Sequence, residues 1–234
     1  MSLHTPAAET TNSFPADLEP MRPTAVLFDL DGTISNSGPV ITTSIAETLA
    51  EFGYPEQSPE ELLQFVGPPI REGFHTLAGV PADHLDAVVA DYRARYNDRM
   101  LQAPIFPGMA DVVRDLHARR VPLALATSKR RSLAVVILQD AGLSQYFTVL
   151  CGASDDESRA AKADIVADAL ADLGKHDVDL SRAVMVGDRH HDVDGAAEHG
   201  LPTILVDWGY ARPEESQGAH AVVREVDELV RLLS

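Results

Sequence analysis

Short apolar segments and amphipathic segments alternate along most of this chain, and this alternation constrains the fold more than any other feature. VPLALATS (121–128) and AVMVGD (183–188) have the length and composition of buried strands. Segments with helical spacing of apolar residues lie between such strands, for example RRSLAVVILQDAGL (130–143). Strands that alternate with helices are typical of a parallel sheet with helices on both faces. We therefore predict an α/β fold with a doubly wound parallel sheet.

One long stretch, residues 36–103, breaks the alternation, because it contains no convincing strand. Its segments at 41–53 and 83–101 have apolar residues at helical spacing, and Ser58 with Glu61 forms a capping-box pattern at the start of a third helix. We interpret this stretch as a small helical insertion. The predicted organisation is a flexible leader at 1–20, a core made of 21–35 and 104–234, and a helical domain at 36–103.

Composition excludes several classes of partner. The chain has 36 acidic and 19 basic residues, and its formal net charge of −17 repels nucleic acid and anionic membranes. No apolar run approaches the length of a membrane span. Cys151 is the only cysteine, so no intramolecular disulfide can form. The first 20 residues lack the basic start and apolar core of a secretory signal. We expect a cytoplasmic protein.

The segment AVLFDLDGT (25–33) is the strongest candidate for chemistry. A short apolar strand ends in Asp29 and Asp31, and Gly32 permits a sharp turn of the backbone. Two carboxylates this close repel each other unless a cation lies between them or one keeps its proton. A metal ion with an anionic substrate meets the first condition, and acid/base catalysis uses the second.

Three more groups of polar residues lie where predicted strands end or helices begin. They are Thr127 with Ser128, Lys162, and Asp188 with Asp192. Each alone is explained by a helix cap, a turn or a solvated lysine. Ligands of parallel sheets bind beyond the carboxyl ends of the strands, so the four groups together predict one site there.

These residues resemble the four motifs of the haloacid dehalogenase superfamily. DLDGT, TSK, Lys162 and GDRHHD occur in the order of that superfamily, over residues 21 to about 210. The first motif is highly specific, whereas the second and third are weak by themselves. The resemblance implies a Rossmann-like core, with 36–103 as the helical cap that such enzymes insert after the first motif.

The resemblance also implies a role for each matching residue. Asp29 is expected to be the nucleophile that accepts the phosphoryl group, and Asp31 to protonate the leaving oxygen and then activate water. The implied catalytic set is Asp29, Asp31, Thr127 and Lys162. The implied ligands of a Mg²⁺ cofactor are Asp29, Asp31 (through its backbone carbonyl), Asp188 and Asp192. The expected substrate-binding residues are Gly32, Thr33, Ser128, Lys129 and Arg71.

The match has one departure. Relatives often have proline after the third-motif lysine, but Ala163 follows Lys162 here, so Lys129 and Arg130 are alternative cations. The presence of Asp31 argues against carbon–halogen chemistry, because dehalogenase members lack this second aspartate.

The segments VGPPIREGF (66–74) and VDWGY (206–210) are similar to the branch of phosphoglycolate phosphatases and bacterial 5'-nucleotidases. We expect a magnesium-dependent phosphatase that acts on a small phosphorylated metabolite, with phosphoglycolate first. A 5'-nucleotidase and a phosphomutase are alternatives, and a phospho-accepting or binding domain is the alternative outside enzymes. Monomer and homodimer both stay open.

Two features have two interpretations each. The segment at 67–69 with Arg71 fits a loop that reaches the site or a simple turn between helices. His190 and His191 lie inside the fourth motif, but magnesium prefers oxygen ligands, which favours a role as loop residues.

Overall fold

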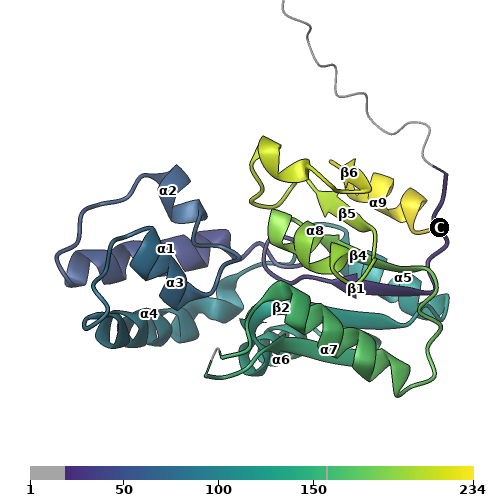
Figure 1. Ribbon diagram of the computed structural model, residues 1–234, viewed down its shortest axis with the longest axis horizontal. Helices are drawn as coiled ribbons and strands as arrows, with labels where there is room; N and C mark the ends of the chain where they lie inside the picture. Colours follow the sequence, from purple (N-terminus) through teal and green to yellow (C-terminus); the bar gives the residue numbers. More distant parts are fainter. Residues whose placement is uncertain (1–18, 157) are drawn as a thin grey trace, which may run out of the picture.

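The computed structural model describes residues 19–156 and 158–234 of the chain. The leader expected at 1–20 therefore lies outside the described residues except for Glu19 and Pro20. A sheet covered by helices and a separate group of helices lie side by side (Figure 1). No described helix has both the length and the hydrophobicity that a membrane span requires.

The sheet confirms the predicted α/β fold. In the described part of the chain it has six strands in the order β3-β2-β1-β4-β5-β6, and every neighbouring pair is parallel. Val26 of the central strand pairs with Leu123 on one side and with Val184 on the other. The strands are β1 (Ala25–Phe28), β2 (Leu123–Arg130), β3 (Val149–Ala153), β4 (Ala183–Gly187), β5 (Thr203–Val206) and β6 (Ala221–Val223).

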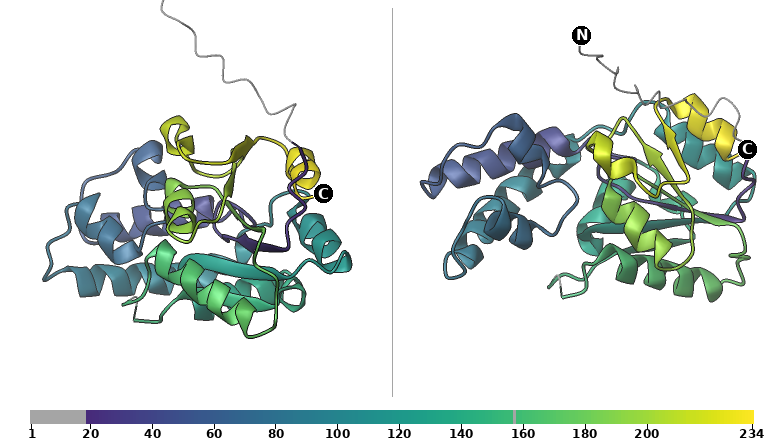
Figure 2. Two further views of the ribbon diagram at one scale, coloured as in Figure 1. Left: turned by 45° about the vertical axis from the view of Figure 1, so that its right-hand side comes forward. Right: turned by 45° about the horizontal axis from the view of Figure 1, so that its top comes forward.

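Helices cover both faces of this sheet (Figure 2). Successive residues of a strand point to opposite faces, so Leu27 joins one buried cluster and Phe28 the other. The first cluster packs against α7 (Lys162–Gly174) and α8 (His190–Ala197). The second packs against α5 (Met109–Ala118), α6 (Arg131–Asp140) and α9 (Val226–Leu232). Short 3₁₀ helices lie at η2 (Ser144–Tyr146) and η3 (Pro213–Ser216).

Residues 36–103 form the separate group of helices, and none of them lies in a named strand. Aromatic rings fill its interior: Phe74 contacts Phe65 edge-on at 5.7 Å between centroids, and Tyr92 at 5.8 Å. The expected capping box is present, since Ser58 and Glu61 exchange hydrogen bonds. The elements are α1 (Gly38–Glu51), α2 (Pro59–Leu63), α3 (Ile70–Thr76), α4 (Leu85–Arg99) and η1 (Met100–Gln102).

The chain leaves and re-enters the sheet domain at adjacent points. Ser35 and Ile105 form an antiparallel bridge. On either side of it, the Asn36 amide donates to the Pro104 carbonyl at 2.8 Å, and the Phe106 amide donates to Ile34 at 2.9 Å. The helical group is thus joined to the sheet by two paired segments.

The fourth-motif helix starts earlier than the sequence pattern suggests. The pattern GAAEHG (195–200) predicts a short helix, but α8 already begins at His190. The reason is the Asp192 carboxylate, which accepts hydrogen bonds from the backbone amides of Asp188 at 3.1 Å and Arg189 at 3.0 Å. An acid in the first turn satisfies amides that have no partner within a helix. α3 likewise has no counterpart among the predicted elements.

Candidate active site

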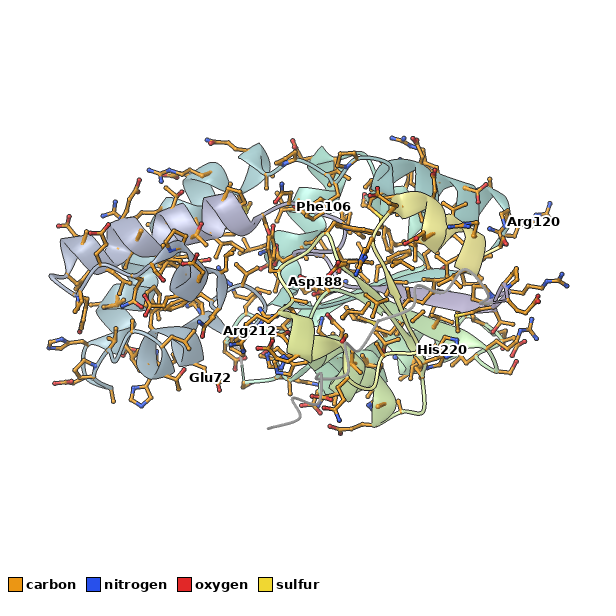
Figure 3. The ribbon with its side chains drawn as sticks, turned by 90° about the horizontal axis from the view of Figure 1, so that it is seen from above. Glu72, Phe106, Arg120, Asp188, Arg212 and His220 are labelled. Atoms are coloured by element: carbon orange, nitrogen blue, oxygen red, sulfur yellow. The ribbon has the colours of Figure 1, made fainter. Side chains whose placement is uncertain are left out.

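The order of the strands brings the predicted site residues together. β1 lies between β2 and β4, so the carboxyl ends of these three strands are neighbours. Asp29 directly follows β1, Thr127 lies in the second half of β2, and Asp188 directly follows β4. Asp188 lies where the sheet meets the helical group (Figure 3). This is the edge at which open parallel sheets bind ligands.

Three aspartates form a buried acidic cluster at this edge. Asp29, Asp188 and Asp192 each offer one carboxylate oxygen, and these oxygens lie within 4.8 Å of one another. Burial raises the pKa of Asp29 to about 6, although the nearby Lys162 acts to lower it. Burial and the neighbouring Asp192 and Asp29 carboxylates raise the pKa of Asp188 well above its ordinary value. The fold therefore holds Asp29 and Asp188 in a buried environment that disfavours their ionised form.

A hard divalent cation fits this cluster. Asp188 Oδ2 accepts a hydrogen bond from the Tyr210 amide at 2.8 Å, but its Oδ1 is buried and has no hydrogen-bond partner among the described residues. A donor set made only of carboxylate oxygens suits Mg²⁺. A cation would supply positive charge that offsets the negative charge of the three carboxylates.

Gly32 is required beside the cluster. Its φ is +82°, which side chains rarely adopt, and a Cβ on it would lie 2.1 Å from Asp188 Oδ2. Thr33, the next residue, is buried, and its carbonyl accepts a hydrogen bond from Trp208 Nε1 at 3.2 Å. Thr33 therefore helps to fix the turn.

Lys162 is the cation nearest to the cluster. It is the first residue of α7, and its Nζ lies 3.0 Å from Asp29 Oδ1 and 2.7 Å from Asp192 Oδ1. Its ammonium also donates to the Ala126 carbonyl at 3.0 Å. Burial acts to lower the pKa of Lys162, but the two carboxylates raise it above its ordinary value, so the lysine is charged. The buried Thr127 hydroxyl lies close by and lowers the pKa of Asp29 by hydrogen bonding.

Asp31 has a different partner from Asp29. Its Oδ2 lies 2.6 Å from Lys129 Nζ, and both side chains are buried. The same ammonium lies 4.7 Å from the centre of the Tyr96 ring on α4, within range of a cation–π contact. Burial acts to lower the pKa of Lys129, but Asp31 raises it above its ordinary value. The Asp31 carboxylate thus stands apart from the acidic cluster, and Lys129 joins the sheet to the helical group.

Two cavities adjoin these residues. A cleft of about 780 Å³ is lined by Lys162, Ser128 and His191 on the sheet side and by Arg71 on the helical side. A smaller cavity of about 70 Å³ is lined by Asp31, Ser128, Lys129, Tyr96 and others. The loop at 67–69 lines both cavities, as expected for a loop that reaches the site.

Arg71 lies on the wall of the cleft and is half-exposed. Its Nη1 forms an ion pair with Asp86 Oδ1 at 2.6 Å. Arg71 and Lys162 thus line the same cleft, and Arg71 is held by an acid of the helical group.

Sequence patterns missed two buried charged neighbours of the site. Arg189, inside the fourth motif, is buried and forms an ion pair with the buried Glu215 of η3 at 2.7 Å. Glu215 lies in the stretch PEES (213–216), which has the composition of a solvated turn. No local signal marks it, because its partner is 26 residues away in the sequence.

Comparison with known proteins agrees with this geometry. The sequence profile of the haloacid dehalogenase-like hydrolases matches residues 26–206. The chain belongs to this family. The predicted resemblance to this family is therefore confirmed over residues 26–206.

Relatives within the family carry different names. Tyrosine-protein kinase PtkA of Mycobacterium tuberculosis is 42% identical over 193 residues, which cover 82% of this chain and 65% of PtkA. Phosphoglycolate phosphatase of Caulobacter vibrioides is 35% identical over 211 residues, 85% of each chain. The crystal structure of a predicted phosphatase from Clostridium acetobutylicum has a TM-score of 0.81 and 30% identity, covering 88% of this chain and 96% of that one.

Proposed function

We propose that this chain is a magnesium-dependent phosphatase that hydrolyses a small phosphorylated metabolite, with phosphoglycolate as the first candidate. The observation that carries the proposal is Asp29, a buried carboxylate that follows the central strand, contacts Lys162 and belongs to the acidic cluster. The name of the Caulobacter relative supports the choice of phosphoglycolate. The free Cys151 and the acidic composition keep the cytoplasm as the expected location.

Asp29 acts as the nucleophile in this proposal. Its carboxylate attacks phosphorus in line with the leaving oxygen and forms an aspartyl phosphate, which water then hydrolyses. Lys162 and the Thr127 hydroxyl lie beside the Asp29 carboxylate, where they hydrogen-bond the oxygens of the transferring phosphoryl group. Asp31, protonated in the substrate complex, gives its proton to the leaving oxygen, and as a carboxylate it later takes one from the attacking water.

Asp29, Asp188, Asp192 and the Asp31 backbone carbonyl would hold Mg²⁺. The bound ion supplies positive charge that offsets the charge of the phosphate oxygens. Gly32 leaves room for this arrangement, since any side chain there would collide with Asp188.

The helical group at 36–103 serves as the cap in this proposal. It contributes Arg71 and the loop at 67–69 to the large cleft, and Tyr96 to the small cavity beside Asp31. Ser128, Lys129 and the backbone at Thr33 lie on the sheet side. We assign the recognition of the leaving group to these residues.

A tyrosine kinase is the second candidate, because PtkA is 42% identical over most of this chain. The same nucleophile would then pass a phosphoryl group to a tyrosine hydroxyl rather than to water. Since the chain spans 65% of the length of PtkA, this candidate concerns the part of PtkA that it matches.

The test is a hydrolysis assay with p-nitrophenyl phosphate, phosphoglycolate, nucleoside monophosphates and sugar phosphates, with Mg²⁺ and with excess EDTA. We expect Mg²⁺-dependent release of phosphate, fastest from one metabolite, and none from Asp29→Asn. A parallel incubation with ATP and a tyrosine-containing peptide tests the kinase. Full hydrolysis in EDTA, or phosphotyrosine without any hydrolysis, would overturn the phosphatase proposal.

A further inference from the structure

Arg189 and Glu215 form a buried ion pair outside the acidic cluster. Arg189 Nε lies 2.7 Å from Glu215 Oε2, and Nη2 donates to Oε1 at 3.1 Å. Their side chains are only 6% and 4% exposed. Burying two charges costs much of what their attraction gains. A buried pair at this place therefore calls for an explanation beyond stability.

The third guanidinium nitrogen of Arg189 reaches the helical group. Its Nη1 donates a hydrogen bond to the backbone carbonyl of Val66, in the loop between α2 and α3. The next residue, Gly67, has φ +113°, and a Cβ built on it would lie 3.5 Å from Arg189 Cγ and Nη1. The guanidinium is thus packed against the backbone of this loop, and Glu215 holds it there with two hydrogen bonds.

The backbone of Arg189 also contacts the acidic cluster. Its amide donates to Asp192 Oδ2 at 3.0 Å, and its neighbour in the chain is Asp188. One residue thus joins the fourth-motif loop to the loop at 66–69. That second loop lines both the large cleft with Lys162 and the small cavity with Asp31.

We propose that Arg189, oriented by Glu215, is a positioning residue that fixes the loop at 66–69 over the active site and ties its place to that of Asp192. A simpler role for Arg189 is to neutralise Glu215. The planar guanidinium separates the two roles, because a lysine can pair with Glu215 but cannot bond both Glu215 oxygens and the Val66 carbonyl together.

Hydrogen exchange of the full-length Arg189→Lys protein tests this inference. The Val66 amide donates to Leu63 and the Gly73 amide to Pro69, so both report opening of the loop region. We expect exchange at these two amides to rise about tenfold to a hundredfold, the effect of one lost hydrogen bond from a charged donor. Exchange at Met185 in β4 should stay unchanged.

Arg212→Lys is the matched control. Arg212, the residue before η3, also contacts Glu215, at 3.3 Å, but its side chain is 55% exposed. We expect no change in exchange at Val66 in this variant. Unchanged exchange at Val66 and Gly73 in a folded Arg189→Lys protein would overturn the inference.

A second variant covers general destabilisation. If Arg189→Lys also raises exchange at Met185, the pair is replaced by Arg189→Met with Glu215→Gln, which leaves no charge at either of these two positions. A larger increase in exchange at Val66 than at Met185, each relative to the wild type, supports the inference in this double variant. Equal increases at the two amides contradict it.

Kinetics extend the test, and this part alone rests on the proposed function. With the best substrate of the hydrolysis assay, Arg189→Lys should raise KM by a larger factor than it lowers kcat, because in the proposed function the loop would contact the leaving group and not the phosphorus. A fall in kcat alone would contradict the assignment. If the wild-type protein hydrolyses nothing, the proposed function fails, and amide exchange still decides the inference.

Discussion

The two aspartates of DLDGT should have opposite effects on stability when each is changed to asparagine. Burial raises the pKa of Asp29 from 3.8 to about 6, so the folded protein resists its ionisation. Asp31 instead forms a buried ion pair with Lys129 at 2.6 Å. In a metal-free protein at neutral pH, Asp29→Asn removes an unfavourable charge, whereas Asp31→Asn leaves Lys129 buried without this partner.

The size of the Asp29 effect follows from its pKa. A raised carboxyl pKa costs nothing below the unfolded value near 3.8, and the cost accumulates until the pH passes about 6. At about 1.4 kcal/mol per pKa unit, the full cost is about 3 kcal/mol at pH 7.5 and about 1 kcal/mol at pH 4.5. The free energy of unfolding of Asp29→Asn should exceed that of the wild type by up to this amount. Asp31→Asn should lose about 3 to 5 kcal/mol, the usual cost of breaking a buried ion pair.

Urea unfolding followed by circular dichroism, in excess EDTA at pH 7.5 and 4.5, measures both free energies of unfolding. Adding Mg²⁺ should stabilise the wild type more than Asp29→Asn, since the variant has lost a proposed ligand. If Asp29→Asn is less stable than the wild type in EDTA at pH 7.5, the account of its charge is wrong. A more stable Asp31→Asn protein would refute the role of its ion pair with Lys129.

Two further predictions concern the metal and the general acid. Gly32→Ala should weaken Mg²⁺ binding in calorimetric titration, because its Cβ would lie 2.1 Å from Asp188 Oδ2. Gly53→Ala is the control and should bind Mg²⁺ like the wild type, because Gly53 has a similar φ of +70° and open space around it. Equal binding by both variants would contradict the steric argument. Asp31→Asn should slow hydrolysis of an alkyl phosphate about a hundredfold to ten-thousandfold and that of p-nitrophenyl phosphate much less. With p-nitrophenyl phosphate it should give a burst and then slow turnover in stopped-flow measurements, and a burst from Asp29→Asn would rule out Asp29 as the nucleophile.

Sequence patterns predicted the sheet and the place of the acidic cluster because both depend on local order. Asp29 and Asp188 each follow an apolar strand, and parallel strands bring such positions to one edge. Lys162 was also predicted beside Asp29, and the structure brings its ammonium to 3.0 Å from that carboxylate. These side chains are positioned by the element that carries them.

Contacts between distant segments could not be predicted in this way. Lys129 was expected to bind substrate, but its ion pair with Asp31 and its contact with Tyr96 depend on how the helical group docks on the sheet. Glu215 and Arg189 meet only because η3 folds back over the fourth motif. No spacing or composition in either segment records that docking.

The paired segments at the base of the helical group have a consequence for how the family can vary. Because Ser35 and Ile105 are bridged neighbours, the segment between them forms one closed loop that begins and ends at the same place on the core. Loop-closure entropy grows only with the logarithm of length, and doubling such a loop costs about 0.6 kcal/mol. Lengthening or trimming the insertion at 36–103 therefore changes the entropy cost of closing it only slightly. A core of this kind can acquire new selectivity by exchanging its insertion while the residues after β1 and β4 stay in place.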